Sequence, residues 1–241
     1  MSALLSVKDL AISFGDNHVL KSLNLEVAEG EVLGVIGPNG AGKTVMLNIL
    51  TGILSPSRGE VLFKGEDILH LTVPQRCKKG IGRTFQVPRP FENMTVLENI
   101  MVGNAFGDHK TQNEAIDKST ELAEQIGLAD KLLTFAGDLG LLDRKRLEIG
   151  RALASNPDLL LFDEVAGGLT VSEVDLIIEL VEMVKQRGIG VIWIEHVLKT
   201  MHEGTDRVLL MAEGRDVICG QPDEVMRSKE CHDVYLGADE E

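Results

Sequence analysis

One short segment constrains the fold of this 241-residue chain more than any other. Residues 37–44 read Gly-Pro-Asn-Gly-Ala-Gly-Lys-Thr, a complete G-x-x-x-x-G-K-[ST] phosphate-binding loop. An apolar run, residues 32–36, precedes the loop, and a helix-like run, residues 45–50, follows it, with Gly52 as the predicted end of the helix. A strand, a glycine-rich loop and a helix in this order predict an α/β fold built around a phosphate site.

The residue types in this loop suit a nucleoside triphosphate. Glycines let backbone N–H groups approach phosphate oxygens without an obstructing Cβ, and a helix N-terminus adds partial positive charge. Lys43 is expected to reach the β- and γ-phosphates, and the Thr44 hydroxyl to bind Mg²⁺. No Asn-Lys-x-Asp run is present to read guanine, which favours ATP over GTP. The predicted ATP-binding residues of the loop are Asn39, Gly40, Ala41, Gly42, Lys43 and Thr44.

Composition limits the possible partners. A chain that is 44% hydrophobic and 26% charged is expected to form one large or two small globular domains. Its formal net charge of −14 argues against nucleic acid, because phosphates repel an acidic surface. The three cysteines lack metal-like spacing, which predicts reduced thiols in a cytosolic protein. We expect neither a signal peptide nor a membrane span, so that any membrane association would come through a partner.

Changes of pattern along the chain predict its organisation. Short apolar runs separated by turn residues predict antiparallel strands at 4–12, 23–27, 59–63 and 64–68. Helical patterns dominate the next part, at 96–102, 114–126 and 144–155, with an exposed loop at 107–113. Strand-like runs return only at 159–162 and 191–194, and they flank an amphipathic helix at 172–186, which predicts a parallel β-α-β unit. The prediction is a single α/β domain whose nucleotide-binding core and antiparallel β subdomain, residues 1–86 and 158–241, are interrupted by a helical subdomain, residues 87–157.

Four polar side chains follow predicted strands. Asp163 and Glu164 end the run at 159–162; Asp163 is predicted to hold Mg²⁺, and Glu164 to orient or deprotonate the attacking water. His196 follows the run at 191–194 and is predicted to hydrogen-bond the γ-phosphate. Gln86 ends the strand before the helical part, and its amide is predicted to bind Mg²⁺ or the attacking water. Each residue alone also fits a purely structural role, but their order after a phosphate loop favours catalysis.

That order resembles the ATP-binding subunits of ABC transporters over nearly the whole chain. Within that family, residues 82–86 and 95–100 and the closing Tyr235-Leu236-Gly237 resemble subunits of branched-chain amino-acid importers. The resemblance implies a P-loop NTPase fold, with hydrolysis of ATP in the presence of Mg²⁺. The implied partners are a second ABC ATPase subunit, membrane permease subunits and, indirectly, a solute-binding protein. The implied location is the cytoplasm, peripheral on the inner face of the cell membrane.

The resemblance also implies roles for single residues. Phe14 matches the aromatic residue that stacks on adenine, with local packing as the alternative. Residues 167–170 match the loop that crosses to the second subunit, although Thr170 stands where Asp or Asn is common. Residues 86–91 correspond to the groove that receives a helix of the membrane subunit, and Phe91 could equally be part of the local packing.

The signature loop, which in this family closes the partner subunit's ATP, departs from the pattern Leu-Ser-Gly-Gly-Gln. Residues 139–143 read Leu-Gly-Leu-Leu-Asp, so a hydroxyl is lost and a leucine replaces a glycine that lets the backbone approach phosphate. Asp143 adds a negative charge and is expected to cap the following helix. We expect Gly140, Leu141, Leu142 and Asp143 to bind the partner's nucleotide weakly. A pair of ATPase subunits would then have one strong and one weak composite site.

Two alternatives stay open at this point. The unusual signature loop fits an ATP-binding subunit that acts mainly as a structural or regulatory clamp. A soluble ABC-type ATPase of repair or translation is the other alternative, although such proteins usually have two cassettes or long insertions.

Overall fold

The structure is a computed structural model that describes residues 3–107 and 112–236. Within these residues ten strands form one sheet in the order β5-β4-β1-β2-β10-β9-β3-β8-β7-β6. The strands are β1 (Leu5–Phe14), β2 (Asn17–Val27), β3 (Val32–Ile36), β4 (Arg58–Phe63), β5 (Glu66–Asp67), β6 (Ile81–Arg83), β7 (Leu159–Asp163), β8 (Gly190–Ile194), β9 (Arg207–Ala212) and β10 (Arg215–Gly220).

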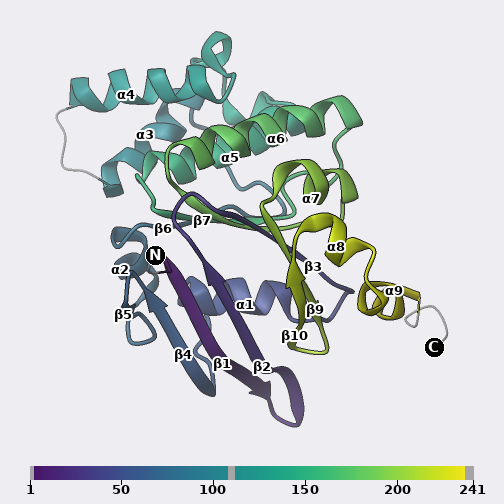
Figure 1. The fold of residues 1–241 in the computed structure, drawn as a ribbon. Coiled ribbons are helices and arrows are strands. Elements are labelled where there is room, and N and C mark those ends of the chain that lie inside the picture. The colour runs from purple at the N-terminus through teal and green to yellow at the C-terminus, as the bar shows by residue number, and fades with distance from the viewer. Residues whose placement is uncertain (1–2, 108–111, 237–241) are drawn as a thin grey trace.

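One half of the sheet is antiparallel, as predicted. Strand β1 pairs with β2 and β4, and β4 pairs with β5. The last of these strands is shorter than the predicted run at 64–68, because Lys64 and Gly65 both adopt positive φ angles in the turn before it. Figure 1 shows β1, β2 and β4 on the side of the molecule away from α3, α4, α5 and α6.

The other half is mainly parallel. Strand β3 lies between β8 and β9 and is parallel to both, and β7 lies between β6 and β8. Every residue of β3, β7 and β8 is buried, as expected for parallel strands covered on both faces. The prediction that strand-like runs return only at 159–162 and 191–194 is wrong, because β9 and β10 follow them. The apolar run in β9, residues 208–211, is too short for periodicity to separate a strand from a buried helix.

Helices cover this parallel half. They are α1 (Lys43–Leu50), α2 (Val73–Lys78), α3 (Val96–Gly107), α4 (Gln112–Gln125), α5 (Leu141–Ala154), α6 (Val171–Gln186), α7 (Leu198–Gly204), α8 (Pro222–Met226) and α9 (Lys229–Leu236). Helices α3, α4 and α5 fall within the predicted helical subdomain and pack on one another, whereas the subdomain's boundaries stay a prediction. Residues 108–111 of the predicted loop, and Gly237 of the closing motif, lie outside the described residues. Among the described helices, none has the length and apolar character needed to cross a bilayer.

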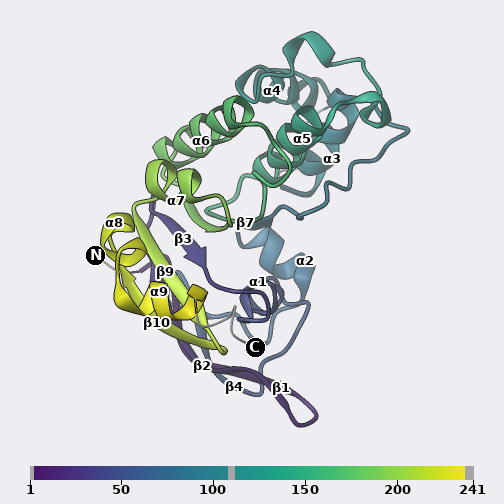
Figure 2. The same ribbon diagram turned by 90° about the vertical axis from the view of Figure 1, so that its right-hand side faces the viewer.

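Two hydrophobic cores lie on opposite faces of the parallel strands. Alternate residues of β3 separate between them: Val32 and Ile36 pack with the helical side, and Leu33 and Val35 pack with α1 and the antiparallel strands. Figure 2 shows α1 beneath β3, with α6 and α7 above it. The carboxyl ends of β3, β6, β7 and β8 therefore open between the two layers, where the candidate site lies.

Candidate functional site

The phosphate loop connects β3 to α1, as predicted. Gly37 has a φ of 149°, and a Cβ at this position would lie 2.0 Å from the Met211 carbonyl oxygen of β9. Gly42 has a φ of 98°, and a Cβ there would lie 2.5 Å from Leu20 Cδ2 of β2. Both glycines are therefore required by the packing of the loop against neighbouring strands. No side chain caps the N-terminus of α1, whose N-cap is Gly42, so its first N–H groups can serve an anion.

The residues of the phosphate loop differ in exposure. Asn39, Gly40 and Thr44 are exposed, whereas Ala41 and Lys43 are buried. The Lys43 Nζ donates to the carbonyl oxygens of Gly37, at 2.6 Å, and of Pro38, at 3.0 Å. The ammonium group thus lies inside the loop, in the position from which it could bind phosphate oxygens.

The surroundings of Lys43 show that the two predicted acids are close. Burial lowers the pKa of the Lys43 amine, and the nearby carboxylates of Glu164 and Asp163 oppose this shift. Burial also raises the pKa of Asp163, against the effect of Arg83. The charged groups of the phosphate loop and of the end of β7 therefore influence one another's pKa values.

Glu164 is the centre of a hydrogen-bonded cluster. Its Oε2 accepts from Gln86 Nε2 at 2.5 Å, and its Oε1 lies 2.8 Å from His196 Nε2. The three residues come from the segment after β6, the turn after β7 and the turn after β8. The structure thus brings together the three residues predicted to be catalytic, although Gln86 lies three residues beyond the end of β6 and not in the strand.

Asp163 has a partner that the sequence analysis missed. Its Oδ2 accepts from Arg83 Nη2 at 2.9 Å, and both side chains are less than one-tenth exposed. The Nη1 of Arg83 also donates to Asn48 Oδ1 of α1, at 2.6 Å. Arg83 therefore links the predicted metal-binding acid to the helix of the phosphate loop. An arginine at the end of a buried strand, three residues before Gln86, was the available signal for it.

The residues predicted to hold Mg²⁺ fit that ion chemically. A hydroxyl (Thr44), a carboxylate (Asp163) and an amide (Gln86) supply oxygen donors, which Mg²⁺ prefers, and they lie at the same end of the parallel strands. No group of three or more His, Cys, Asp or Glu side chains suited to a metal occurs in the described residues. Mg²⁺ with only a few protein ligands and substrate phosphates fits such a site.

The signature loop lies at the start of α5. Gly140 is the N-cap of α5, so the prediction that Asp143 caps this helix is wrong. Asp143 instead accepts from Lys131 Nζ at 2.5 Å and lies 3.5 Å from Arg146 Nη1. Two cations thus offset the negative charge that Asp143 adds to the loop. Leu141 is 44% exposed and lies beside Gly168 of the crossing loop, and Leu142 packs against the helical core.

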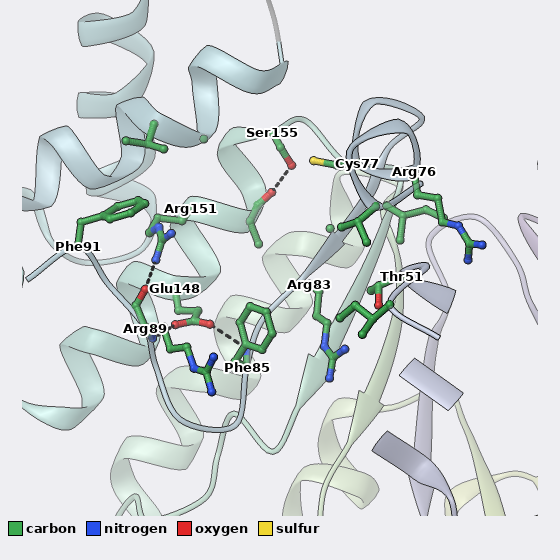
Figure 3. Close-up of a pocket in the computed structure, with 17 residues that line it drawn as sticks. Thr51, Arg76, Cys77, Arg83, Phe85, Arg89, Phe91, Glu148, Arg151 and Ser155 are labelled. Carbon is green, nitrogen blue, oxygen red and sulfur yellow. Dashed lines mark hydrogen bonds between the residues drawn. The ribbon is translucent and has the colours of Figure 1, made fainter. Parts of the chain in front are cut away.

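A groove lies beside the segment that carries Gln86 (Figure 3). Its volume is about 370 Å³, and residues of α2, β6, α3 and α5 line it together with Phe85, Arg89 and Phe91. The Arg89 guanidinium lies over the Phe85 ring, with its Cζ 5.6 Å from the ring centroid. The Arg151 guanidinium lies over the Phe91 ring, with its Cζ 4.7 Å from the ring centroid. Phe91 is 45% exposed, so its ring is available to a partner as well as to local packing.

Phe14 is half exposed at the end of β1, as a residue that stacks on a ligand must be.

The sequence analysis missed two charged residues of α5, Lys145 and Glu148, which are buried. They share the face of α5 that also carries Ile149 and Ala152, and a charge among buried helix positions was the available signal.

This chain is similar to known proteins in both sequence and fold. A family model described as ABC transporter matches residues 20–167. The high-affinity branched-chain amino acid transport ATP-binding protein LivG of Escherichia coli is 34% identical over 249 residues, covering 97% of this chain and 98% of LivG. The lipopolysaccharide export system ATP-binding protein LptB of Haemophilus influenzae is 31% identical, covering 98% of each chain. The ADP conformation of MJ1267, an ATP-binding cassette of an ABC transporter, superposes with a TM-score of 0.89 at 28% identity, covering 98% of this chain and 100% of that one.

Proposed function

This chain belongs to the ABC transporter family as an ATP-binding subunit whose ATP hydrolysis is coupled to transport, and we propose that it powers the uptake of amino acids or related small polar solutes. The observation that carries this proposal is the match to LivG along almost the entire length of both chains. LptB matches a similar share of this chain, so lipopolysaccharide export is the rival function.

The proposed mechanism assigns each residue of the site a task. Lys43 and the N–H groups at the start of α1 bind the phosphates of ATP, and Phe14 stacks on the adenine. Glu164 orients or deprotonates the attacking water. Its contact with Gln86 Nε2, at 2.5 Å, supports this task, because the amide fixes the position of one carboxylate oxygen. His196 holds the other oxygen. Its proposed task is to hydrogen-bond the terminal phosphate.

Thr44, Asp163 and Gln86 are the residues that would hold Mg²⁺. When bound, the ion neutralises charge on the phosphate oxygens as the terminal phosphoryl group leaves. Arg83 keeps the Asp163 side chain oriented through its bond to Oδ2, in a place where burial alone favours the protonated acid.

A non-hydrolysing clamp is the alternative that the signature loop suggests. The complete cluster of Gln86, Glu164 and His196 favours hydrolysis at this chain's own site. The variant loop concerns the partner's nucleotide, and the cations beside Asp143 reduce the repulsion expected there. We propose a pair with a second ABC ATPase subunit, in which the site closed by Gly140, Leu141, Leu142 and Asp143 is the weaker one.

Membrane permease subunits are the proposed partners of the groove beside residues 86–91. Exposed aromatic rings and arginines line it, so we expect a helix with apolar and acidic side chains to dock there. Such docking would hold the chain on the cytoplasmic face of the membrane, with a solute-binding protein acting through the permease.

Transport assays can decide between import and export. The chain, its ATPase partner, the permease subunits and the solute-binding protein are reconstituted in vesicles, with Mg·ATP on the side of this chain. We expect ATP-driven movement of radiolabelled leucine or a related solute, and none with Lys43→Ala, whose nucleotide affinity should be lost. Release of lipopolysaccharide without solute movement would replace the proposal with export. Full nucleotide affinity in Lys43→Ala would contradict the phosphate-loop assignment.

A further inference from the structure

Helix α5 has two buried charges that the proposed mechanism does not use. Lys145 is 4% exposed and Glu148 is 7% exposed, and they lie three residues apart on one face of the helix. A buried charge is costly unless strong hydrogen bonds compensate it. The groups that these two side chains bind therefore indicate why charges stand at these positions.

Glu148 binds the backbone on both sides of Gln86. Its Oε1 accepts from the N–H of Phe85 and its Oε2 from the N–H of Arg89, each at 2.8 Å. The Nη1 of Arg151, one turn further along α5, donates to the Arg89 carbonyl oxygen at 2.7 Å. Three bonds from one helix thus hold the two ends of segment 85–89, as the sticks in Figure 3 show.

Lys145 binds the backbone of the catalytic turn. Its Nζ donates to the carbonyl oxygen of Glu164 at 3.2 Å. Glu164 has a φ of 51°, which is unfavourable for a residue other than glycine and needs support from its surroundings. The Glu164 N–H donates to the Ile194 carbonyl oxygen of β8, at 2.9 Å, so the peptide groups on both sides of this residue are held.

The two segments that α5 holds meet through their side chains. Gln86 Nε2 and Glu164 Oε2 lie 2.5 Å apart, so small shifts of either backbone would break their contact. The same helix begins with the signature loop, residues 140–143. A displacement of α5 would therefore reach both catalytic segments together.

We propose that Lys145 and Glu148 are positioning residues, which fix the backbones of Glu164 and Gln86 for hydrolysis and tie both to the helix that bears the signature loop. This inference rests on the proposed ATPase site. It assigns a task to two residues that touch no nucleotide, and it makes α5 the physical connection between this chain's own catalytic cluster and the partner's nucleotide.

Two substitutions test it with little change of shape. Glu148→Gln leaves one acceptor oxygen for two N–H donors, and Lys145→Met removes the donor but keeps most of the length of the side chain. In the assembled transporter we expect kcat to fall about tenfold in each, the cost of one charge-assisted hydrogen bond, with KM for ATP within about twofold. Lys145→Arg, which keeps a donor, should recover most of the loss. Lys185→Met, which removes a partly exposed ion pair to Asp206 beside the start of β3, at the opposite end of this strand from the phosphate loop, is the matched control and should leave kcat unchanged.

Amide hydrogen exchange in the full chain supplies a readout that a general loss of stability would not reproduce. We expect faster exchange at residues 85–89 in Glu148→Gln and at residues 164–167 in Lys145→Met, with β3 and β8 unaffected. An unchanged kcat, or faster exchange throughout the molecule with a kcat loss that follows the melting temperature, would overturn the proposal. If the unaltered complex hydrolysed no ATP, the proposed function would fail, whereas local exchange would still decide whether these residues position the two segments.

Discussion

At the scale of single residues, Glu164 makes most of the contacts on which the proposed mechanism of hydrolysis depends. Its carboxylate is held by Gln86 and His196, its carbonyl oxygen by Lys145, and its N–H by β8. A left-handed backbone at a non-glycine residue is commonly retained where it aims a functional side chain. The geometry therefore supports the catalytic task proposed for Glu164.

Replacing Glu164 with glutamine tests that task. The amide keeps the shape of the side chain but cannot accept a proton, so we expect kcat to fall by a factor of about 10² or more while Mg·ATP still binds. Turnover of the assembled transporter and calorimetric titration of Mg·ATP measure the two properties. Glu66→Gln, at an exposed ion pair with Lys79, is the control. Wild-type turnover in Glu164→Gln would remove this residue from the mechanism.

At the scale of secondary-structure elements, three helices begin in the same way. Helices α2, α3 and α6 each begin with a capping box, whose first residue is the N-cap. The sequences are Thr72-Val-Pro-Gln75, Thr95-Val-Leu-Glu98 and Thr170-Val-Ser-Glu173. At α6 the Thr170 N–H donates to Glu173 Oε2 at 2.8 Å. Thr170 was noted as a departure from the Asp or Asn common in the crossing loop, and its capping bonds explain why threonine suits this position.

Thr170→Ala should measure how much this cap contributes to the free energy of unfolding. Loss of the hydroxyl leaves a helix N–H without its acceptor, so we expect the free energy of unfolding to fall by about 0.5–2 kcal/mol. Thr170→Asp, which keeps an acceptor, should stay close to the unaltered protein. Urea unfolding of the full chain supplies both values. Equal stability of the alanine and aspartate variants would show that the cap contributes nothing measurable.

At the scale of the whole molecule, burial opposes ionisation at several acids. Burial raises the pKa of Glu148, of Asp163 and of Glu195, which is 1% exposed. A carboxyl group whose pKa is higher in the folded state than in the unfolded state binds more protons when folded. Its contribution to stability is therefore fully present below the unfolded pKa of about 4.3 and is lost as the pH rises through the folded pKa.

Glu195→Gln isolates one such contribution. Because glutamine does not titrate, the free energy of unfolding of the variant, relative to the unaltered chain, should be higher at about pH 8 than at about pH 4. Urea unfolding at the two pH values gives this difference. Glu66→Gln should show the opposite sign, since hydrogen bonding to Lys79 lowers the pKa of Glu66. Differences of the same sign in the two variants would contradict the assignment of the shift to burial.

Local patterns predicted much of the fold and of the candidate site. The phosphate loop, the β7-α6-β8 unit and the helices of residues 87–157 were all recognisable, because each follows from neighbouring residues and their periodicity. The strands β9 and β10 were not recognised, because the apolar run of β9 is too short for periodicity to identify a strand, and the pairing of β9 with β3 and of β10 with β2 joins distant parts of the chain. The roles of the site residues stay predictions until the variants are measured.

The sequence by itself determined which chemical groups this protein has and in what order they occur, because the phosphate loop, the acids after β7 and the histidine after β8 each depend on a short stretch of chain. Only the tertiary structure decided how these groups meet. Gln86, Glu164 and His196 converge from three separate turns, Arg83 pairs with Asp163, and two cations offset the charge of Asp143. Such pairings depend on which strands become neighbours and which charges become buried, and no local pattern specifies either.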